Sequence, residues 1–260
     1  MKRANLLRSA ALLAAIGLTA APLLAADKPV VTVFAAASLK EAFDAAAPAF
    51  TKATGYPVRF SYGGSDTLVA QLLQGAPADV FASANQQQMQ RAIDGGIVPL
   101  TRVFAHNHLV VIVPANDTAV ATVADLGKKG IKVVLAAPSV PVGNYARQTF
   151  TNLNKDPAFG ADFAARVQGN VVSEETDVKA VATKISLAEG DAGVVYATDV
   201  TPAIATKVHV LRFPAGAAPA ATYPIAVPKN APNVEGGRAF LEFITSPVGI
   251  AFLRARGFEE

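Results

Sequence analysis

One stretch near the beginning of the chain sets its architecture: Val30-Val31-Thr32-Val33-Phe34-Ala35-Ala36-Ala37-Ser38-Leu39-Lys40-Glu41. Its first five residues are apolar or β-branched, which is typical of a strand. Three alanines follow, and then apolar side chains recur at helical spacing, at Leu39, Phe43, Ala46 and Phe50. A strand that passes directly into a helix is the repeating unit of an α/β fold.

The same alternation of strand and helix patterns continues along the chain. Further strands are predicted at the apolar runs 58–62, 79–81, 109–113, 132–135, 193–196, 208–211 and 223–227. Helical spacing recurs at Val178, Val181, Ile185 and Ala188. Strands that alternate with helices predict an α/β fold with mainly parallel pairing.

The first 26 residues have the composition of a secretory signal. Lys2, Arg3 and Arg8 precede an apolar run over 10–18, and small residues lead to Ala26, after which cleavage is expected. Without this leader, the 23 basic and 20 acidic side chains become 20 of each over 234 residues. A balanced charge removes the electrostatic argument for a nucleic-acid partner. The signal itself predicts export, and we expect a periplasmic protein.

Cysteine is absent from the sequence, and no later segment has the roughly 20 uninterrupted apolar residues of a membrane span. Disulfides, thiolate metal sites, a thiol nucleophile and a lipid-bearing cysteine are thereby excluded.

The length of the mature chain fits one large domain or two small ones, and two regions favour two lobes. The apolar run 109–113 follows a polar triplet, and a loose Pro/Gly/Ala stretch over 214–221 precedes the run 223–227. If these two strands lie side by side, the chain crosses between the lobes twice. We therefore predict one lobe from 27–113 and 215–260, and a second lobe from 114–214.

Two turns in the first predicted lobe combine small residues with hydroxyls at the start of a helix. Ser38 and Glu41 have the spacing of a capping box, and Gly63-Gly64-Ser65 leads into the next helix. The free N–H groups at a helix N-terminus can hold an anion without a cationic side chain. Taken singly, each turn also fits a capped helix with no ligand.

Two further turns fall in the second predicted lobe. A Pro- and Gly-rich turn over 137–145 leads into a helix, and 173–177 is expected to open another, with Glu174, Glu175 and Asp177 complementing its dipole. Tyr196 ends a buried-looking strand, and its hydroxyl needs a hydrogen-bond partner. In α/β sheets, ligands bind outside the carboxyl ends of the strands, so these turns are expected to face one another across a cleft.

The order of these segments resembles the periplasmic molybdate-binding proteins of ABC transporters. The resemblance is carried by four motifs, Val31-Thr32-Val33-Phe34-Ala35-Ala36-Ala37-Ser38-Leu39, Gly75-Ala76-Pro77-Ala78-Asp79-Val80-Phe81-Ala82-Ser83-Ala84, Val140-Pro141-Val142-Gly143-Asn144-Tyr145-Ala146 and Gly193-Val194-Val195-Tyr196. It covers nearly all of 30–256.

The resemblance implies a type II periplasmic-binding-protein fold, in which two α/β lobes joined by a hinge of two crossovers close on a tetrahedral oxyanion. The family's ligand-binding positions fall on Ser38 and Ser65, on the backbone of Val142 and Val178, and on the hydroxyl of Tyr196. The implied ligand is molybdate, with tungstate of nearly the same shape. The implied partners are a membrane permease and its ATPase; the protein itself is expected to be monomeric, without a cofactor, a metal cation or a catalytic residue.

Asp66 departs from the pattern, because some relatives have a small hydroxyl residue there. Molybdate and sulfate only accept hydrogen bonds at neutral pH, whereas phosphate keeps a proton and suits an acceptor. An inward Asp66 would therefore favour phosphate. As an early helical residue, it is expected to face solvent instead.

Three alternatives stay open at this point. The protein could be a receptor for sulfate or phosphate, because cavity size is not legible in the sequence. An organic anion calls for an arginine clamp, but Arg147 is expected on the outside of its helix. A secreted metal-dependent enzyme would use the histidines, which are His106, His108 and His209; their setting favours surface positions.

Overall fold

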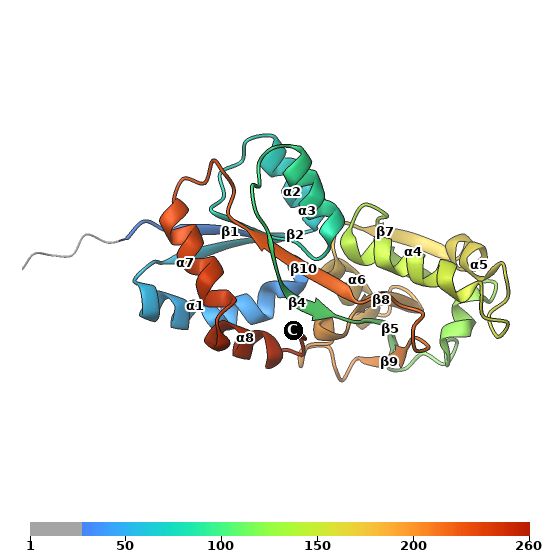
Figure 1. Cartoon of the computed structure of the whole chain (residues 1–260). Helices are drawn as coiled ribbons and strands as arrows, with labels where there is room; N and C mark the ends of the chain where they lie inside the picture. The colour runs from blue at the N-terminus through green and yellow to red at the C-terminus, as the bar shows by residue number, and fades with distance from the viewer. Residues whose placement is uncertain (1–27) are drawn as a thin grey trace, which may run out of the picture.

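The computed structural model describes residues 28–260, and the predicted signal over 1–26 lies outside the described residues. Two five-stranded sheets form two lobes that lie side by side (Figure 1). The first lobe contains β1 (Val31–Ala36), β2 (Val58–Gly63), β3 (Val80–Ala82), β4 (Arg102–Asn107) and β10 (Ala221–Ala226). Its helices are α1 (Lys40–Thr54), α2 (Ser65–Leu73), α3 (Gln86–Asp94), α7 (Val234–Ile244) and α8 (Pro247–Arg254).

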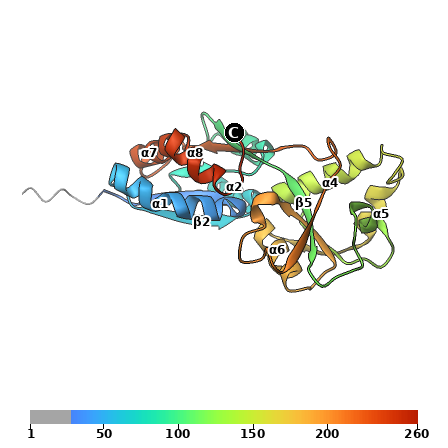
Figure 2. The ribbon, with the colours of Figure 1, turned by 90° about the horizontal axis from the view of Figure 1, so that it is seen from below.

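The second lobe contains β5 (Leu109–Pro114), β6 (Val133–Ala136), β7 (Val171–Glu175), β8 (Ala192–Tyr196) and β9 (Val208–Arg212). Its helices are α4 (Pro141–Leu153), α5 (Phe163–Gly169) and α6 (Val178–Ser186). Viewed from below, the two lobes stay separate bodies joined near β5 (Figure 2). No helix within 28–260 has the length and apolarity that crossing a bilayer requires.

The two sheets follow the same plan. In the first, the order is β2-β1-β3-β10-β4, with β1 parallel to β2 and β3, and β10 antiparallel to its neighbours. In the second, the order is β7-β6-β8-β5-β9, with β6 parallel to β7 and β8, and β5 antiparallel to its neighbours. The predicted α/β fold is confirmed, but the expected mainly parallel pairing is wrong: four of the eight strand pairings within 28–260 are parallel and four are antiparallel, because β10 and β5 are each inserted antiparallel to both neighbours.

The predicted strands are all present, but β4 and β7 were not predicted. Both lie at the edge of a sheet, where one side of the strand meets solvent and polar side chains are tolerated. The stretch 173–177 was expected to open a helix; instead Ser173, Glu174 and Glu175 belong to β7. The helix begins at Val178, with Asp177 as the N-cap that accepts a hydrogen bond from the Ala180 N–H at 3.0 Å.

The expected lobe boundary after residue 113 is wrong for the strand 109–113. This strand is β5, and it pairs with β8 and β9 of the second sheet, whereas β10 pairs with β3 and β4. A single residue, His108, therefore carries the first crossover, and 213–220 carries the second. Because 109–113 is apolar on both faces, its sequence fits the centre of either sheet.

The carboxyl end of the chain returns to the first crossover. His106 and Glu259 exchange two backbone hydrogen bonds, N to O distances of 2.6 and 3.0 Å, and the Phe258 ring packs edge-on against Tyr223. The last residues thus form a short bridge on β4 beside the crossover.

A glycine fixes how closely α4 approaches the end of β6. A Cβ at Gly143 would lie 2.2 Å from the carbonyl oxygen of Ala137 and 2.3 Å from that of Ala136. Gly169, at the end of α5, has no neighbour within 4 Å of such a Cβ.

We expect Gly143→Ala to lower the free energy of unfolding by roughly 1–3 kcal/mol, because the helix must shift off the strand. Gly169→Ala is the matched control and should leave stability unchanged or raise it by up to about 1 kcal/mol. Urea unfolding of both variants measures the difference. Equal stabilities of the two variants would contradict this account.

Candidate ligand-binding site

A small cavity lies between the two lobes, at the carboxyl ends of β1, β2, β6 and β8. Its lining residues come from both lobes: Ala36, Ala37, Ser38, Gly63, Gly64, Ser65, Ala84, Val140, Pro141, Val142, Asp177, Val178 and Tyr196. The structure thus brings together in one cavity all five residues that the sequence singled out, Ser38, Ser65, Val142, Val178 and Tyr196. No lysine or arginine of the described chain is among the lining residues.

Three helices point their N-termini at this cavity. α2 begins at Ser65, α4 at Pro141 and α6 at Val178. The first N–H groups of a helix have no intrahelical acceptor, and the helix dipole makes this end partially positive. Because Pro141 has no N–H, Val142 carries the first free one of α4. The cavity is therefore surrounded by backbone donors.

Ser38 does not cap its helix, so the predicted capping box with Glu41 is wrong. A 3-10 turn, η1 (Ala37–Leu39), precedes α1 and moves the N-cap to Leu39. This turn places the Ser38 hydroxyl oxygen 2.9 Å from the hydroxyl of Tyr223. Its side chain is 3% exposed.

The Ser65 hydroxyl is oriented by the backbone of Ala84. The Ala84 N–H donates to Ser65 Oγ over 3.0 Å. Since this N–H can only donate, Ser65 accepts here and its own hydrogen stays free for another acceptor. The residue is 1% exposed, so that acceptor has to come from the cavity.

Tyr196 places its hydroxyl in the cavity without a hydrogen-bond partner in the described structure. The side chain is 1% exposed, and burial, helped by the neighbouring Tyr223 hydroxyl, raises the pKa of Tyr196 well above its ordinary value. The phenol therefore stays protonated and keeps a hydrogen to donate. A buried, unpaired hydroxyl is costly, and a bound acceptor would remove this cost.

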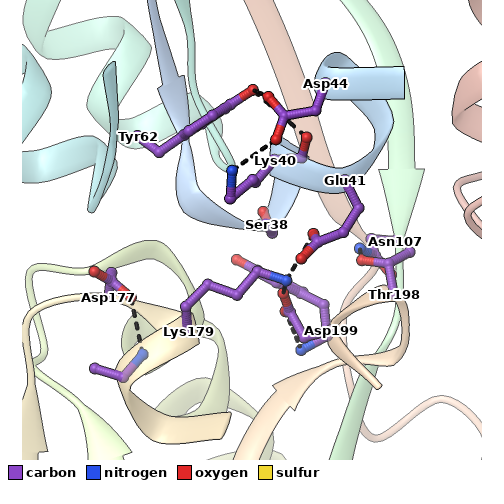
Figure 3. Close-up of polar contacts among 12 residues, drawn as sticks. Ser38, Lys40, Glu41, Asp44, Tyr62, Asn107, Asp177, Lys179, Thr198 and Asp199 are labelled. Atoms are coloured by element: carbon purple, nitrogen blue, oxygen red, sulfur yellow. Dashed lines mark hydrogen bonds and ion pairs between the residues drawn. The ribbon is translucent and has the colours of Figure 1, made fainter. Parts of the chain in front are cut away.

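Beside the cavity, a lysine joins the two lobes. The Lys179 ammonium of α6 lies 2.8 Å from Glu41 of α1 and 3.0 Å from Asp199 in η3 (Ala197–Asp199) (Figure 3). Burial raises the pKa of Asp199 to about 6, against the opposing effect of Lys179. Burial alone would lower the pKa of Lys179, but the charges of Asp199 and Glu41 outweigh it and raise this pKa.

On the other side of the cavity, Asp66 makes a second contact between the lobes. Its Oδ2 accepts a hydrogen bond from the Ser139 hydroxyl over 2.6 Å, and its Oδ1 is buried without a partner in the described structure. Asp66 is partly buried, so it neither lies free in solvent, as expected, nor points into the cavity. The Ser139 hydroxyl of the other lobe contacts its carboxylate, which the helix-dipole argument alone does not predict. Asp66 is not among the cavity-lining residues.

The three histidines lie apart from the cavity lining and contact different partners. The His106 ring faces Thr222, His108 pairs with Glu259 at 2.9 Å, and His209 bonds the carbonyl oxygen of Ala115 at 3.0 Å. Within 28–260, no three metal-ligating side chains gather at one place.

Arg147 was expected on the outside of its helix, which is wrong. Its guanidinium donates to the carbonyl oxygens of Ala136 and Gly143 at 2.9 and 3.0 Å, and it pairs with Glu174. The main-chain oxygens at the end of β6 attract it there.

Four residues around the cavity escaped prediction: Asn107, Lys179, Asp199 and Tyr223. Asn107 and Tyr223 lie in strands and touch Ser38 or its partners, while Lys179 and Asp199 follow Val178 and Tyr196 closely in the chain. For Lys179 and Asp199, adjacency to predicted site residues was the only signal in the sequence. No local pattern marks Asn107 and Tyr223, because their roles come from long-range packing.

Comparisons with known proteins identify the family of this chain. A family model described as bacterial extracellular solute-binding protein matches residues 31–259. The molybdate-binding protein ModA of Mycobacterium tuberculosis is 36% identical over an alignment of 233 residues that covers 88% of this chain and 84% of that protein.

Two solved structures share the fold. The periplasmic molybdate-binding protein of Azotobacter vinelandii superposes with a TM-score of 0.75 at 21% identity, covering 88% of this chain and 99% of that one. The sulfate-binding protein SubI of Mycobacterium tuberculosis superposes with a TM-score of 0.78 at 18% identity, covering 89% and 86%. With a family match that spans nearly all described residues, this chain belongs to the bacterial extracellular solute-binding proteins.

Proposed function

We propose that this protein captures molybdate between its two lobes and delivers it to the permease and ATPase of an ABC importer. The observation that carries the proposal is the set of hydrogen-bond donors that converge on the cavity without a cationic side chain among them. Ser38, Ser65 and Tyr196 supply hydroxyls, and Val142 and Val178 supply backbone N–H groups. The relatives named for molybdate binding support the choice of ligand.

The chemistry of the cavity favours an anion that only accepts hydrogen bonds. Asp177 lines the cavity, but its carboxylate is engaged by the N–H of Ala180 in the helix cap. Asp66, the acceptor that would suit a protonated phosphate, bonds Ser139 instead. Molybdate and tungstate, which have nearly the same shape, fit this set of donors, and sulfate is the alternative that differs in size.

The remaining parts of the proposal follow from this role. The mature protein begins after Ala26, works in the periplasm as a monomer, and binds the oxyanion without a cofactor and without converting it. Closure of two lobes around a hinge turns occupancy into a shape that a permease can recognise.

Loss of one hydroxyl donor should weaken oxyanion binding. We expect Ser38→Ala and Ser65→Ala each to lower the affinity for molybdate by roughly tenfold or more, since a hydrogen bond to a charged group contributes about 1.5–3 kcal/mol. Ser186→Ala is the matched control, because its hydroxyl bonds the carbonyl oxygen of Thr183 away from the cavity. Isothermal titration of the ligand-free mature protein measures all three.

The same titration separates the candidate ligands. Molybdate and tungstate should bind with similar affinity and more tightly than sulfate or phosphate. If sulfate binds more tightly than molybdate, sulfate is the ligand. Unchanged affinity in both Ser38→Ala and Ser65→Ala would refute the assigned site.

The buried Asp199 should give folding a characteristic pH dependence. Its pKa is higher in the folded protein than in the unfolded chain, so between about pH 4 and 6 the folded state binds more protons at this group. The contribution of Asp199 to the free energy of unfolding therefore falls as the pH rises through this window.

The Asp199→Asn variant lacks this titration. We expect the free energy of unfolding of the wild type, relative to the variant, to decrease between about pH 4 and pH 7. Urea unfolding of both proteins at several pH values measures this difference. A difference that stays constant across the window would show that Asp199 titrates normally.

A further inference from the structure

Three buried polar groups connect the first crossover to the cavity. Asn107 ends β4 next to His108, Tyr223 lies in β10, and Ser38 lines the cavity. The Asn107 Nδ2 atom lies 3.4 Å from the Tyr223 hydroxyl oxygen, which in turn lies 2.9 Å from Ser38 Oγ. Asn107 is 1% exposed and Tyr223 is fully buried, so water does not compete for these bonds.

The orientation of the Asn107 amide is fixed by its neighbours. The backbone N–H of His108 donates to Asn107 Oδ1 over 2.9 Å, and an N–H can only find an acceptor. The other atom of the amide is therefore the nitrogen, which donates to Thr198 Oγ1 at 2.8 Å and to Tyr223.

This orientation decides the direction of the next bond. The Tyr223 oxygen accepts from Asn107, and its hydroxyl lies 2.9 Å from Ser38 Oγ. The arrangement that gives the buried Tyr223 hydrogen this acceptor has Ser38 Oγ accepting from Tyr223, which leaves the Ser38 hydrogen for the cavity.

We propose that Asn107 and Tyr223 are positioning residues that hold the Ser38 hydroxyl as a donor toward the bound oxyanion. This inference rests on the proposed function, because it needs an acceptor-only anion in the cavity. A serine hydroxyl can either donate or accept, and an anion without hydrogens repels the accepting orientation. A relay that fixes the direction beforehand avoids the cost of reorienting the group on binding.

The relay also connects the donor to the hinge. Asn107 Oδ1 accepts a hydrogen bond from the N–H of His108, the single residue of the first crossover, and its Nδ2 donates to Thr198 of the second lobe (Figure 3). One amide group thus touches both lobes and the relay at once. The direction of the Ser38 hydroxyl is thus set next to the crossover between the lobes.

The substitution Asn107→Asp reverses the relay while keeping its shape. A carboxylate only accepts, so Tyr223 would donate to it, and Ser38 would then donate to Tyr223 and turn its lone pairs toward the anion. The Thr198 hydroxyl can rotate to donate, and the N–H of His108 keeps an acceptor. We expect molybdate affinity, measured by isothermal titration, to fall by at least about tenfold.

A second substitution separates the relay from the added charge. In the double variant Asn107→Asp, Tyr223→Phe, the phenylalanine cannot accept from Ser38, so the Ser38 hydroxyl is free to donate to the anion again. We expect the double variant to bind molybdate several-fold more tightly than Asn107→Asp alone, although it loses one more polar atom. Equal or weaker binding of the double variant would overturn the relay, because charge repulsion or packing would then explain the first loss.

A double-mutant cycle at Ser38 and Tyr223, with Asn107 unchanged, tests the relay if the Asn107→Asp variant does not fold. Tyr223→Phe should weaken binding by about two- to fivefold when Ser38 is present and should have no effect in a Ser38→Ala background. An equal loss in both backgrounds would overturn the relay. If the wild-type protein binds none of molybdate, tungstate and sulfate, both the proposed function and the relay are overturned. If the wild type binds one of these anions but the double variant does not regain affinity over Asn107→Asp, only the relay is overturned.

Discussion

Donors that the protein leaves without partners are the feature on which the region between the lobes depends. Among residues 28–260, the hydroxyl of Tyr196 is buried and unpaired, the hydrogen of Ser65 is not used in its bond to the Ala84 N–H, and the N-termini of α2, α4 and α6 present free N–H groups. Each of these groups costs stability in the absence of an acceptor. A protein that keeps them together at one place retains a site for an acceptor.

The charged groups near the cavity are engaged with one another. Lys179 lies between Glu41 and Asp199, and Asp66 bonds Ser139, so charge serves contact between the lobes on both sides of the cavity. A lysine that is already paired with two carboxylates has little attraction left for an anion next to it. Contact between the lobes and the lining of the cavity therefore use different residues, although Lys179 directly follows the cavity residue Val178.

Local patterns were sufficient for most of the fold but not for the whole site. The strand and helix periodicities predicted the layers, and the turns at the ends of β1 and β2 drew attention to Ser38 and Ser65, whereas Val142, Val178 and Tyr196 were assigned through the family resemblance. The edge strands β4 and β7 were missed because solvent-facing strands lose the apolar signal. The lobe of β5 could not be predicted, since a strand that is apolar on both faces fits either sheet. The capping box failed because a 3-10 turn shifted the helix start, and the roles of Asn107 and Tyr223 depend on contacts between distant segments.

Only His108 separates β4 from β5. Consecutive Cα atoms are about 3.8 Å apart, so the edges of the two lobes that meet at this residue cannot slide away from each other. Under the proposed function, in which the two lobes close on a ligand, this short joint and the second crossover over 213–220 would confine the relative movement of the lobes largely to rotation. Small changes in a few backbone torsions at such a joint would give the largest displacements in the parts of each lobe that lie farthest from it.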